Sequence, residues 1–347
     1  MPLLSNISAQ LAGHQRLLVA YSGGLDSTVL LHLLVQLAKT SPDLQLRAIH
    51  IHHGLSANAD RWSQHCQQQC DRWQLPLIIE QIKVDGREKG IEAAARAARY
   101  AAFRRHLQPG EALLTAQHLD DQCETLLLAL KRGSGPAGLA AMPEQLWLGE
   151  NLLLRPLLAR SRQQLELWAE QHQLSWVEDE SNQDVRYDRN FLRQQVLPLL
   201  NQRWPHFAAA TARSAALCGE QEQLLDELLA ESLASLVQPD GSLHIEALYS
   251  LSEVRRFALI RRWLAGQGGL MPSRDALQRI WHEVINSRED ASPRIQLGDY
   301  EIRRYRQAIY WLPIMPSLRD TVIAWQRPWL PLQLPHQLGT VSINDGG

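Results

Sequence analysis

Short apolar runs alternate with helix-like stretches through the first third of the chain. Four runs have the length and composition of buried parallel strands: 17–22, 46–52, 77–80 and 113–116. The stretches between and after them carry apolar residues at helical spacing or are rich in alanine, and they predict helices at 28–39, 58–74, 92–107 and 118–132. This order predicts an α/β fold built on a doubly wound parallel sheet.

Ligands of such folds bind beyond the carboxyl ends of the strands. Three segments of this chain follow predicted strands directly: Ser22–Ser27, His52–Leu55 and Thr115–Asp121. We therefore expect the functional site to be built from these segments.

The pattern changes after residue 215. Helix-like segments and two strand-like runs follow: 220–236, 251–265, 273–287, 294–303 and 308–312. We expect a catalytic domain over residues 1–215 and a smaller, mainly helical domain over 216–315. Residues 316–347 are rich in Pro and Trp and are expected to be a linker or the start of a third domain.

The composition is that of a soluble globular protein. Of the 347 residues, 45% are hydrophobic, and the formal net charge is −2. No apolar run approaches the ~18 residues of a membrane span, and no signal peptide is evident. The four cysteines form no Cys-x-x-Cys pair, which argues against a zinc ribbon or a cysteine-held cluster. These features predict a cytoplasmic protein that does not engage a membrane.

The segment after the first predicted strand has the composition of an anion site. It reads Ser22-Gly23-Gly24-Leu25-Asp26-Ser27 and leads into a predicted helix. Paired glycines allow a tight turn, and a helix start offers unpaired N–H donors and a positive dipole end. A phosphate-bearing ligand is expected, and an acid in such a loop implies Mg²⁺. The simpler alternative is an ordinary strand-to-helix turn with Ser27 or Asp26 as N-cap.

A second polar segment follows the fourth predicted strand. There the chain runs from Thr115 through His118, Asp120, Asp121 and Glu124. Acids stabilise a helix start, so dipole effects alone account for Asp120 and Asp121. They do not account for His118, because a cation is disfavoured at that end. A neutral histidine beside carboxylates fits a metal- or base-bearing site. By helical spacing, Asp120 and Glu124 are expected to share a face.

Arginine dominates the basic residues of the chain. Candidate contacts for polyanions are Lys131, Arg132, Arg189 and Arg193. Arg189 and Arg193 lie four residues apart, a spacing suited to two phosphate contacts. Lys131 and Arg132 precede a glycine-rich run that begins at Gly133, the expected end of the helix. Solvated charges on helix faces explain many of these arginines equally well.

Taken together, the motifs resemble a known enzyme family. The Ser-Gly-Gly-x-Asp-Ser loop resembles the pyrophosphate loop (PP-loop) of the ATP pyrophosphatases. The segment at 118–135, Arg155-Pro156-Leu157-Leu158, and the runs at 178–182 and 189–193 resemble tRNA(Ile)-lysidine synthetases. That family often has Asn-His-Gly-Leu where this chain has His52-His53-Gly54-Leu55, and a histidine where this chain has Gln117. The resemblance spans about residues 15–205.

The resemblance implies a fold like that of the adenine nucleotide α-hydrolases and a ligase reaction. ATP would adenylate the wobble cytidine of tRNA(Ile), and L-lysine would displace AMP at C2 to give lysidine. The residues at 22–27 would bind ATP, with Mg²⁺ held by Asp26 and Asp121. Catalytic roles would fall to Asp26, His118, Asp121 and Glu124. The basic residues named above would contact tRNA, and Arg96 and Arg99 would hold ATP phosphates or the tRNA. Longer relatives carry a further C-terminal domain, and the oligomeric state, a homodimer included, is left open.

Other functions compete with this one. Another PP-loop ATP pyrophosphatase is the nearest alternative. A thiolase would need a cysteine pair or cluster, and a glutamine-hydrolysing synthetase would need a further domain. A nucleotide-binding sensor without catalysis belongs to a different class. The acid-rich segment at 118–124 argues against it, because binding alone needs no such cluster.

Overall fold

The computed structural model describes residues 2–54, 56–83, 91–269, 271–288, 291–325 and 330–343. The chain divides into two compact units, Met1–Gln223 and Leu224–Gly347. The division falls within one long helix, α10 (Phe207–Leu236), which also contains the boundary expected at 215/216.

A six-stranded sheet forms the centre of the first unit. Its strands stand in the order β3-β2-β1-β4-β6-β5. Their bounds are β1 Arg16–Ala20, β2 Gln45–His52, β3 Leu77–Gln81, β4 Ala112–Leu114, β5 Gln145–Leu148 and β6 Asn151–Leu154. All neighbours pair in parallel except β5, which runs antiparallel to β6. Val19 of β1 pairs with Ala48 on one side and with Leu114 on the other. The predicted parallel sheet is therefore confirmed, with β5 and β6 added at one edge.

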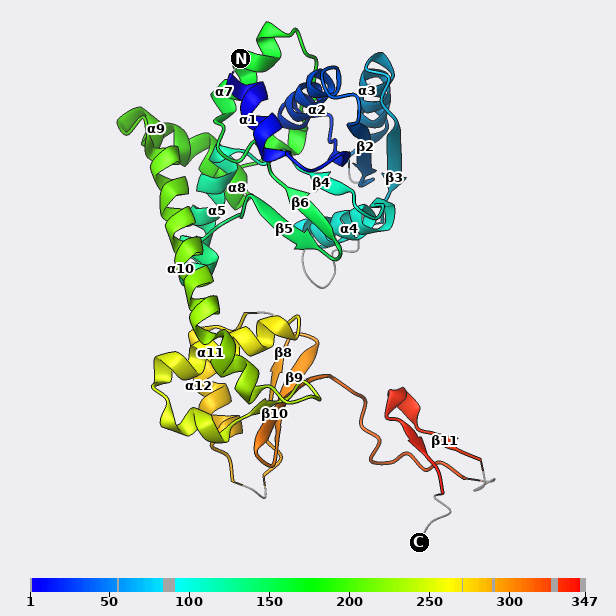
Figure 1. Ribbon diagram of the computed structural model, residues 1–347, viewed down its shortest axis with the longest axis vertical. Helices are drawn as coiled ribbons and strands as arrows, with labels where there is room; N and C mark the ends of the chain where they lie inside the picture. Colours follow the sequence, from blue (N-terminus) through cyan, green and yellow to red (C-terminus); the bar gives the residue numbers. More distant parts are fainter. Residues whose placement is uncertain are drawn as a thin grey trace. The chain divides into compact units, whose positions relative to one another are not determined.

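Helices cover both faces of this sheet (Figure 1). The helices of the unit, apart from the start of α10, are α1 Pro2–Gln10, α2 Leu25–Ala38, α3 Ala59–Arg72, α4 Ile91–His106, α5 Leu119–Lys131, α6 Pro136–Leu139, α7 Arg162–Gln171, α8 Asp188–Phe191 and α9 Leu197–Arg203. One core joins Leu17 and Val19 of β1 to α1, α2, α3 and α7. A second core joins Leu18 of β1 to Phe103 of α4 on the opposite face. The alternation of side chains along β1 thus separates the two layers.

Helix α2 is buried on nearly all sides because it lies beneath other helices as well as on the sheet. Its sequence is almost continuously apolar, and it contacts both α1 and α7. A helix that is apolar all round is expected to be enclosed. Its N-terminus, which follows β1, is consequently held in a rigid setting.

The segment between α8 and α9 contains a π-turn at Leu192–Val196. Pro198 then stands in the first turn of α9, where its missing N–H is not needed. The widened turn therefore comes directly before the helix that contains this proline.

The second unit combines helices with an antiparallel sheet. After α10 come α11 (Glu253–Gly266) and α12 (Arg274–Arg279), and α12 continues as a π-turn over Ile280–Ile285. Four strands stand in the order β7-β10-β9-β8: β7 Leu243–His244, β8 Arg294–Leu297, β9 Tyr300–Tyr305 and β10 Ala308–Pro313. The strand-like runs at 294–303 and 308–312 thus form β8, β9 and β10. A short pair, β11 (Leu332–Gln333) and β12 (Thr340–Val341), lies nearer the end of the chain.

Within the described residues, none of the helices combines the length and the apolar character needed to cross a membrane.

Candidate active site

The turn between β1 and α2 exposes backbone donors at a helix start. Gly24 is the N-cap of α2 and supplies no side-chain hydrogen bond to the helix. The first N–H groups of a helix have no partner within it, so they are available to an anion here. The expected anion site therefore has its backbone element, and the alternative with Ser27 or Asp26 as N-cap is not what forms.

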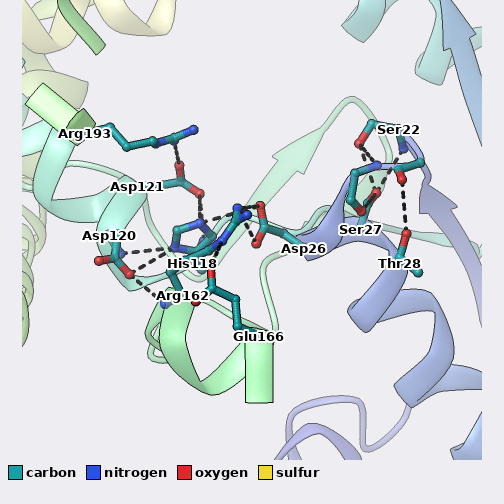
Figure 2. A network of polar contacts seen from close by, with 12 residues as sticks. Ser22, Asp26, Ser27, Thr28, His118, Asp120, Asp121, Arg162, Glu166 and Arg193 are labelled. Carbon is teal, nitrogen blue, oxygen red and sulfur yellow. Dashed lines mark hydrogen bonds and ion pairs between the residues drawn. The ribbon is translucent and has the colours of Figure 1, made fainter. Parts of the chain in front are cut away.

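The hydroxyl groups of this segment hold the turn in shape (Figure 2). Ser22 Oγ and Ser27 Oγ lie 3.0 Å apart, and Ser27 Oγ donates to the carbonyl of Gly24 at 3.0 Å. Thr28 Oγ1 donates to the carbonyl of Gly23 at 3.4 Å. In this structure these hydroxyl groups therefore bond within the turn.

Gly23 is required at its position for two reasons. Its φ of +85° lies in the left-handed region, where side chains are strained. A Cβ added there would also lie 2.9 Å from Cys66 Sγ and 3.1 Å from a methyl carbon of Val177. The N–H of Val177 donates to the carbonyl of Gly23 at 2.9 Å. Cys66 of α3 and Val177, which follows α7, therefore pack against this turn.

His118 caps the start of α5. Its Nδ1 accepts from the N–H of Asp120 at 3.3 Å, and its own N–H donates to Asp121 Oδ2 at 3.0 Å. This reciprocal pair is a capping box with histidine in place of the usual hydroxyl residue. Dipole effects gave no structural reason for a histidine at this helix start. The cap supplies one, since an unprotonated Nδ1 acts as an acceptor.

The second ring nitrogen of His118, Nε2, lies near acids from both predicted segments, Ser22–Ser27 and Thr115–Asp121. This nitrogen lies 3.7 Å from Asp26 Oδ2 and 3.5 Å from Asp121 Oδ2, as Figure 2 shows. Burial by itself would lower the pKa of His118, but the contact of its ring with the Asp120 carboxylate, 3.4 Å from Nδ1, and the charges of Asp121 and Asp26 outweigh burial and raise that pKa. Asp26 from the glycine turn and the acids of α5 therefore form one electrostatic cluster.

Arg162, at the start of α7, holds two of these carboxylates. Its Nη1 contacts both oxygens of Asp26, at 3.2 and 3.0 Å, and its backbone N–H donates to Asp120 Oδ2 at 2.8 Å. Sequence reasoning missed this residue. The available indication was the capping pattern Ser161-x-x-Gln164 before an apolar repeat, which predicts a helix start at Arg162.

Arg193 holds the other two carboxylates. Its Nε and Nη2 donate to the two oxygens of Glu124 at 2.7 and 3.0 Å, and Nη2 also donates to Asp121 Oδ1 at 3.0 Å. Asp121 and Glu124, three residues apart on α5, therefore share one guanidinium group. Burial raises the pKa of Glu124, although Arg193 opposes that rise. The predicted contact of Arg193 with tRNA stays a prediction, since carboxylates occupy its guanidinium here.

The other predicted basic residues lie around this cluster. Arg189 Nη2 lies 3.4 Å from Thr125 Oγ1 on α5. Lys131 pairs with Asp188 at 2.6 Å on the surface, and Arg132 ends α5 before Gly133 at positive φ, as expected. The predicted roles of these side chains toward tRNA are untested.

On α4, the guanidinium of Arg96 lies over the ring of Tyr100. Arg99 belongs to the surroundings of His53, just after β2. Burial, and after it the charge of Arg99, lower the pKa of His53 to about 4. Leu55, the last residue of the predicted segment His52–Leu55, lies outside the described residues.

Two family models match the chain. A model described as "PP-loop domain" matches residues 3–200, and one described as "TilS substrate binding domain" matches residues 243–310. The first covers the sheet and every residue of the Asp26–His118 cluster. The second falls wholly within the second unit.

Curated relatives align with nearly the whole chain. A protein of Serratia proteamaculans, named tRNA(Ile)-lysidine synthase, is 63% identical over 99% of this chain and 79% of its own length. Relatives of the same name from Pectobacterium atrosepticum and Shigella flexneri are 61% and 59% identical over 99% and 98% of this chain, and over 78% and 79% of their own lengths.

A solved structure supports the fold of the first unit. The U34-tRNA thiolase NcsA from Methanococcus maripaludis superposes with a TM-score of 0.54 over 62% of this chain and 77% of that chain. Sequence identity is 16%, so the likeness concerns the fold alone.

Proposed function

Because the chain belongs to the tRNA(Ile)-lysidine synthase family, we propose that it ligates L-lysine to the wobble cytidine of tRNA(Ile). In the proposed reaction the cytidine O2 attacks the α-phosphate of ATP and releases pyrophosphate. The ε-amine of lysine then displaces AMP at C2 of the adenylated base and gives lysidine. We place this reaction in the cytoplasm.

One observation carries the proposal: Asp26 belongs both to the glycine turn and to the His118 cluster. The turn offers N–H donors for the departing pyrophosphate. The cluster stands at the end of the neighbouring strand, with His118 3.7 Å from Asp26. An anion site alone would explain binding, whereas the histidine and acids beside it supply groups for proton transfer.

The carboxylates suit Mg²⁺ in company with a nucleotide. Among the residues that the structure describes, no group of three His, Cys, Asp or Glu side chains is arranged to hold a metal ion. Mg²⁺ commonly takes only one or two carboxylates, with phosphate oxygens and water completing its shell. Asp26 and Asp121 would be those two ligands, since both lie within 4 Å of His118 Nε2. When bound, the ion would offset charge on the phosphates.

We assign to His118 the removal of a proton from the ε-amine of lysine. The oxygens of Glu124 accept from Arg193, and Asp120 accepts from the backbone of Arg162. His118 Nε2 lies beyond hydrogen-bond length from its two carboxylate neighbours. The ordinary pKa of a lysine amine is about 10.4, so the amine must lose a proton before it attacks. In the tautomer whose Nδ1–H faces Asp120 Oδ2 at 3.4 Å, Nε2 is free to accept that proton, and the surrounding carboxylates then stabilise the imidazolium.

Lysine-dependent release of AMP tests the function directly. Purified protein is given ATP, labelled lysine and tRNA(Ile), and the mass of the modified base is measured. We expect lysidine to form with the wild type and to be abolished by Asp26→Ala. Glu166→Gln is the matched control, because Glu166 also pairs with Arg162, at 3.0 Å, but lies on the exposed side of α7. Near-wild-type turnover by Asp26→Ala would contradict the assignment of the glycine turn.

His118→Ala separates binding from chemistry. We expect ATP affinity to stay within a few-fold of wild type, while the single-turnover rate falls on the order of a hundredfold. An unchanged rate would remove His118 from the proton-transfer step.

A further inference from the structure

The sheet of the second unit has two chemically different faces. Ile295, Ile302 and Ile309, one on each of β8, β9 and β10, are almost fully buried in the core of that unit. Helices α11 and α12 lie on that side of the sheet (Figure 1). Because side chains alternate along strands, the neighbours of these isoleucines point to the outer face.

The outer face is rich in arginine and tyrosine. Arg294 pairs with Arg303, and Arg303 pairs with Tyr310, so the three form one row across β8, β9 and β10. Two residues further along β9, Tyr305 is 61% exposed. The guanidinium of Arg306, in the turn that follows, lies 5.2 Å from the centre of its ring. A shallow hollow of about 450 Å³ lies here, lined in part by Arg303, Tyr305 and Tyr310.

This face carries an excess of positive charge. Glu301 is nearly buried among the arginines: Arg303 Nε donates to it at 2.6 Å, and Arg294 Nη1 lies 4.0 Å away. Two guanidinium groups thus share one carboxylate, and Arg306 adds a third positive charge nearby. The carboxylate of Asp240 lies beside Tyr310, so three guanidinium groups stand against two carboxylates. The side chain of Arg294 remains 68% exposed.

Several other arginines of this unit are used internally. Arg256 stacks on Trp281 at 3.8 Å, and Arg304 Nη1 donates to the carbonyls of Ile285 and Ser287. Arg262 pairs with Asp226 at 2.7 Å. The outer face of the sheet therefore combines exposed guanidinium groups with an exposed aromatic ring.

We propose that this face, formed by Arg294, Arg303, Tyr305, Arg306 and Tyr310, docks an unpaired segment of the tRNA. The inference rests on the proposed function and adds where and how the second unit contacts RNA. The ring of Tyr305 stacks on an unpaired base, and the arginines bind the flanking phosphates. A paired stem or an acidic protein would engage the arginines but leave the tyrosine ring without a stacking partner.

Two variants of the full chain test the two parts of the proposal. Tyr305→Ala should weaken binding of a tRNA(Ile) transcript on the order of tenfold, while Tyr305→Phe should not. Arg294→Ala should lower the slope of log affinity against log salt concentration by about 0.7, the value for one single-strand phosphate contact. Arg279→Ala is the matched control, since it removes the same charge from an exposed pair with Glu283 on α12. Thermal unfolding checks that each variant is folded.

The outcomes separate this proposal from the function it rests on. Unchanged tRNA affinity and salt slope in Tyr305→Ala and Arg294→Ala, with lysidine still formed, would overturn the docking face alone. Weaker binding by Arg294→Ala but not by Tyr305→Ala would overturn the single-stranded mode and indicate phosphate contact only. An equal loss with Arg279→Ala would indicate a general charge effect and overturn the site. A wild-type protein that forms no lysidine would instead contradict the proposed function.

Discussion

Arg193 donates hydrogen bonds from two nitrogens to the carboxylate of Glu124, and the glutamate side chain has no solvent exposure. The same guanidinium reaches Asp121, so one side chain fixes two acids of α5. A buried carboxylate that loses its cation is left as an uncompensated charge, which is more costly than the absence of the whole pair.

Arg193→Ala should therefore reduce both stability and activity. Because the arginine is about one third exposed, we expect the free energy of unfolding to fall by about 2 kcal/mol, below the range for fully buried pairs. Adding Glu124→Gln should restore much of this stability but not lysidine formation. Urea unfolding of the two single variants and the double variant measures the coupling. Lys131→Ala, which breaks an exposed pair with Asp188, should change stability by no more than about 0.5 kcal/mol. If the effects of Arg193→Ala and Glu124→Gln on the free energy of unfolding are additive, the pairing of Arg193 with Glu124 is contradicted.

Gly23→Ala should remove ATP binding for a reason that Gly149→Ala does not share. Both glycines have positive φ, but only at Gly23 would a Cβ meet other atoms. Backbone strain alone costs about 1 kcal/mol or more at either position. Gly149→Ala should lose that stability and keep ATP affinity, whereas Gly23→Ala should lose both. Calorimetric titration with ATP and unfolding curves give the two measurements. Normal ATP affinity in Gly23→Ala would show that the turn tolerates displacement.

Substitutions of Arg162 test whether activity requires its contact with the Asp26 carboxylate. Arg162→Ala frees both oxygens of Asp26 and should lower kcat/KM for lysidine formation by up to about a hundredfold. Arg162→Lys keeps the charge and should recover part of the activity, because lysine lacks the planar fork of arginine. If both variants match the wild type, Asp26 is held by other contacts.

Stability should depend on pH through His32, a buried residue of α2. Trp168 Nε1 donates to its Nδ1 at 3.1 Å, which requires an unprotonated nitrogen. Burial, and after it the charges of His172 and Lys39, lower the pKa of His32 from 6.5 to about 4. Between these values the unfolded chain binds more protons than the folded one, so stability falls as the pH drops from about 6.5 to about 4.

The loss from this one group should be about 3 kcal/mol. It should be missing in His32→Gln, which does not titrate. Carboxylates titrate in both proteins. The difference between the free energies of unfolding of wild type and variant, measured at each pH of this range, therefore isolates the contribution of His32. His282→Gln, on an exposed position of the second unit, serves as a matched histidine control. A constant difference between wild type and His32→Gln would show that His32 protonates without cost.

Local pattern was sufficient for the sheet and for half of the site. The strands of the parallel sheet are apolar runs, and the glycine turn and the acids at 118–124 follow two of them directly. That two adjacent strands would bring Asp26 to His118 follows from sheet topology. Nothing local placed β5 and β6, which were not predicted, or showed that Arg193 would join Glu124 to Asp121.

The rest depended on contacts between distant segments. Arg162 is 136 residues from Asp26 along the chain, and Arg193 is 72 residues from Asp121. The sequence assigned Arg193 to the tRNA backbone because its four-residue spacing from Arg189 suits two phosphate contacts. Only the packing of α8 and the π-turn against α5 shows that two carboxylates occupy it.

The hydrogen bond from Val177 to Gly23 also bears on the order of synthesis. A ribosome releases the glycine turn early, with β1 and α2, but the residue that closes it emerges much later. Arg162 and Arg193, which hold the acids, also belong to the later half of the unit. A nascent chain that stops before these residues would thus carry a strand and a helix without a finished nucleotide site.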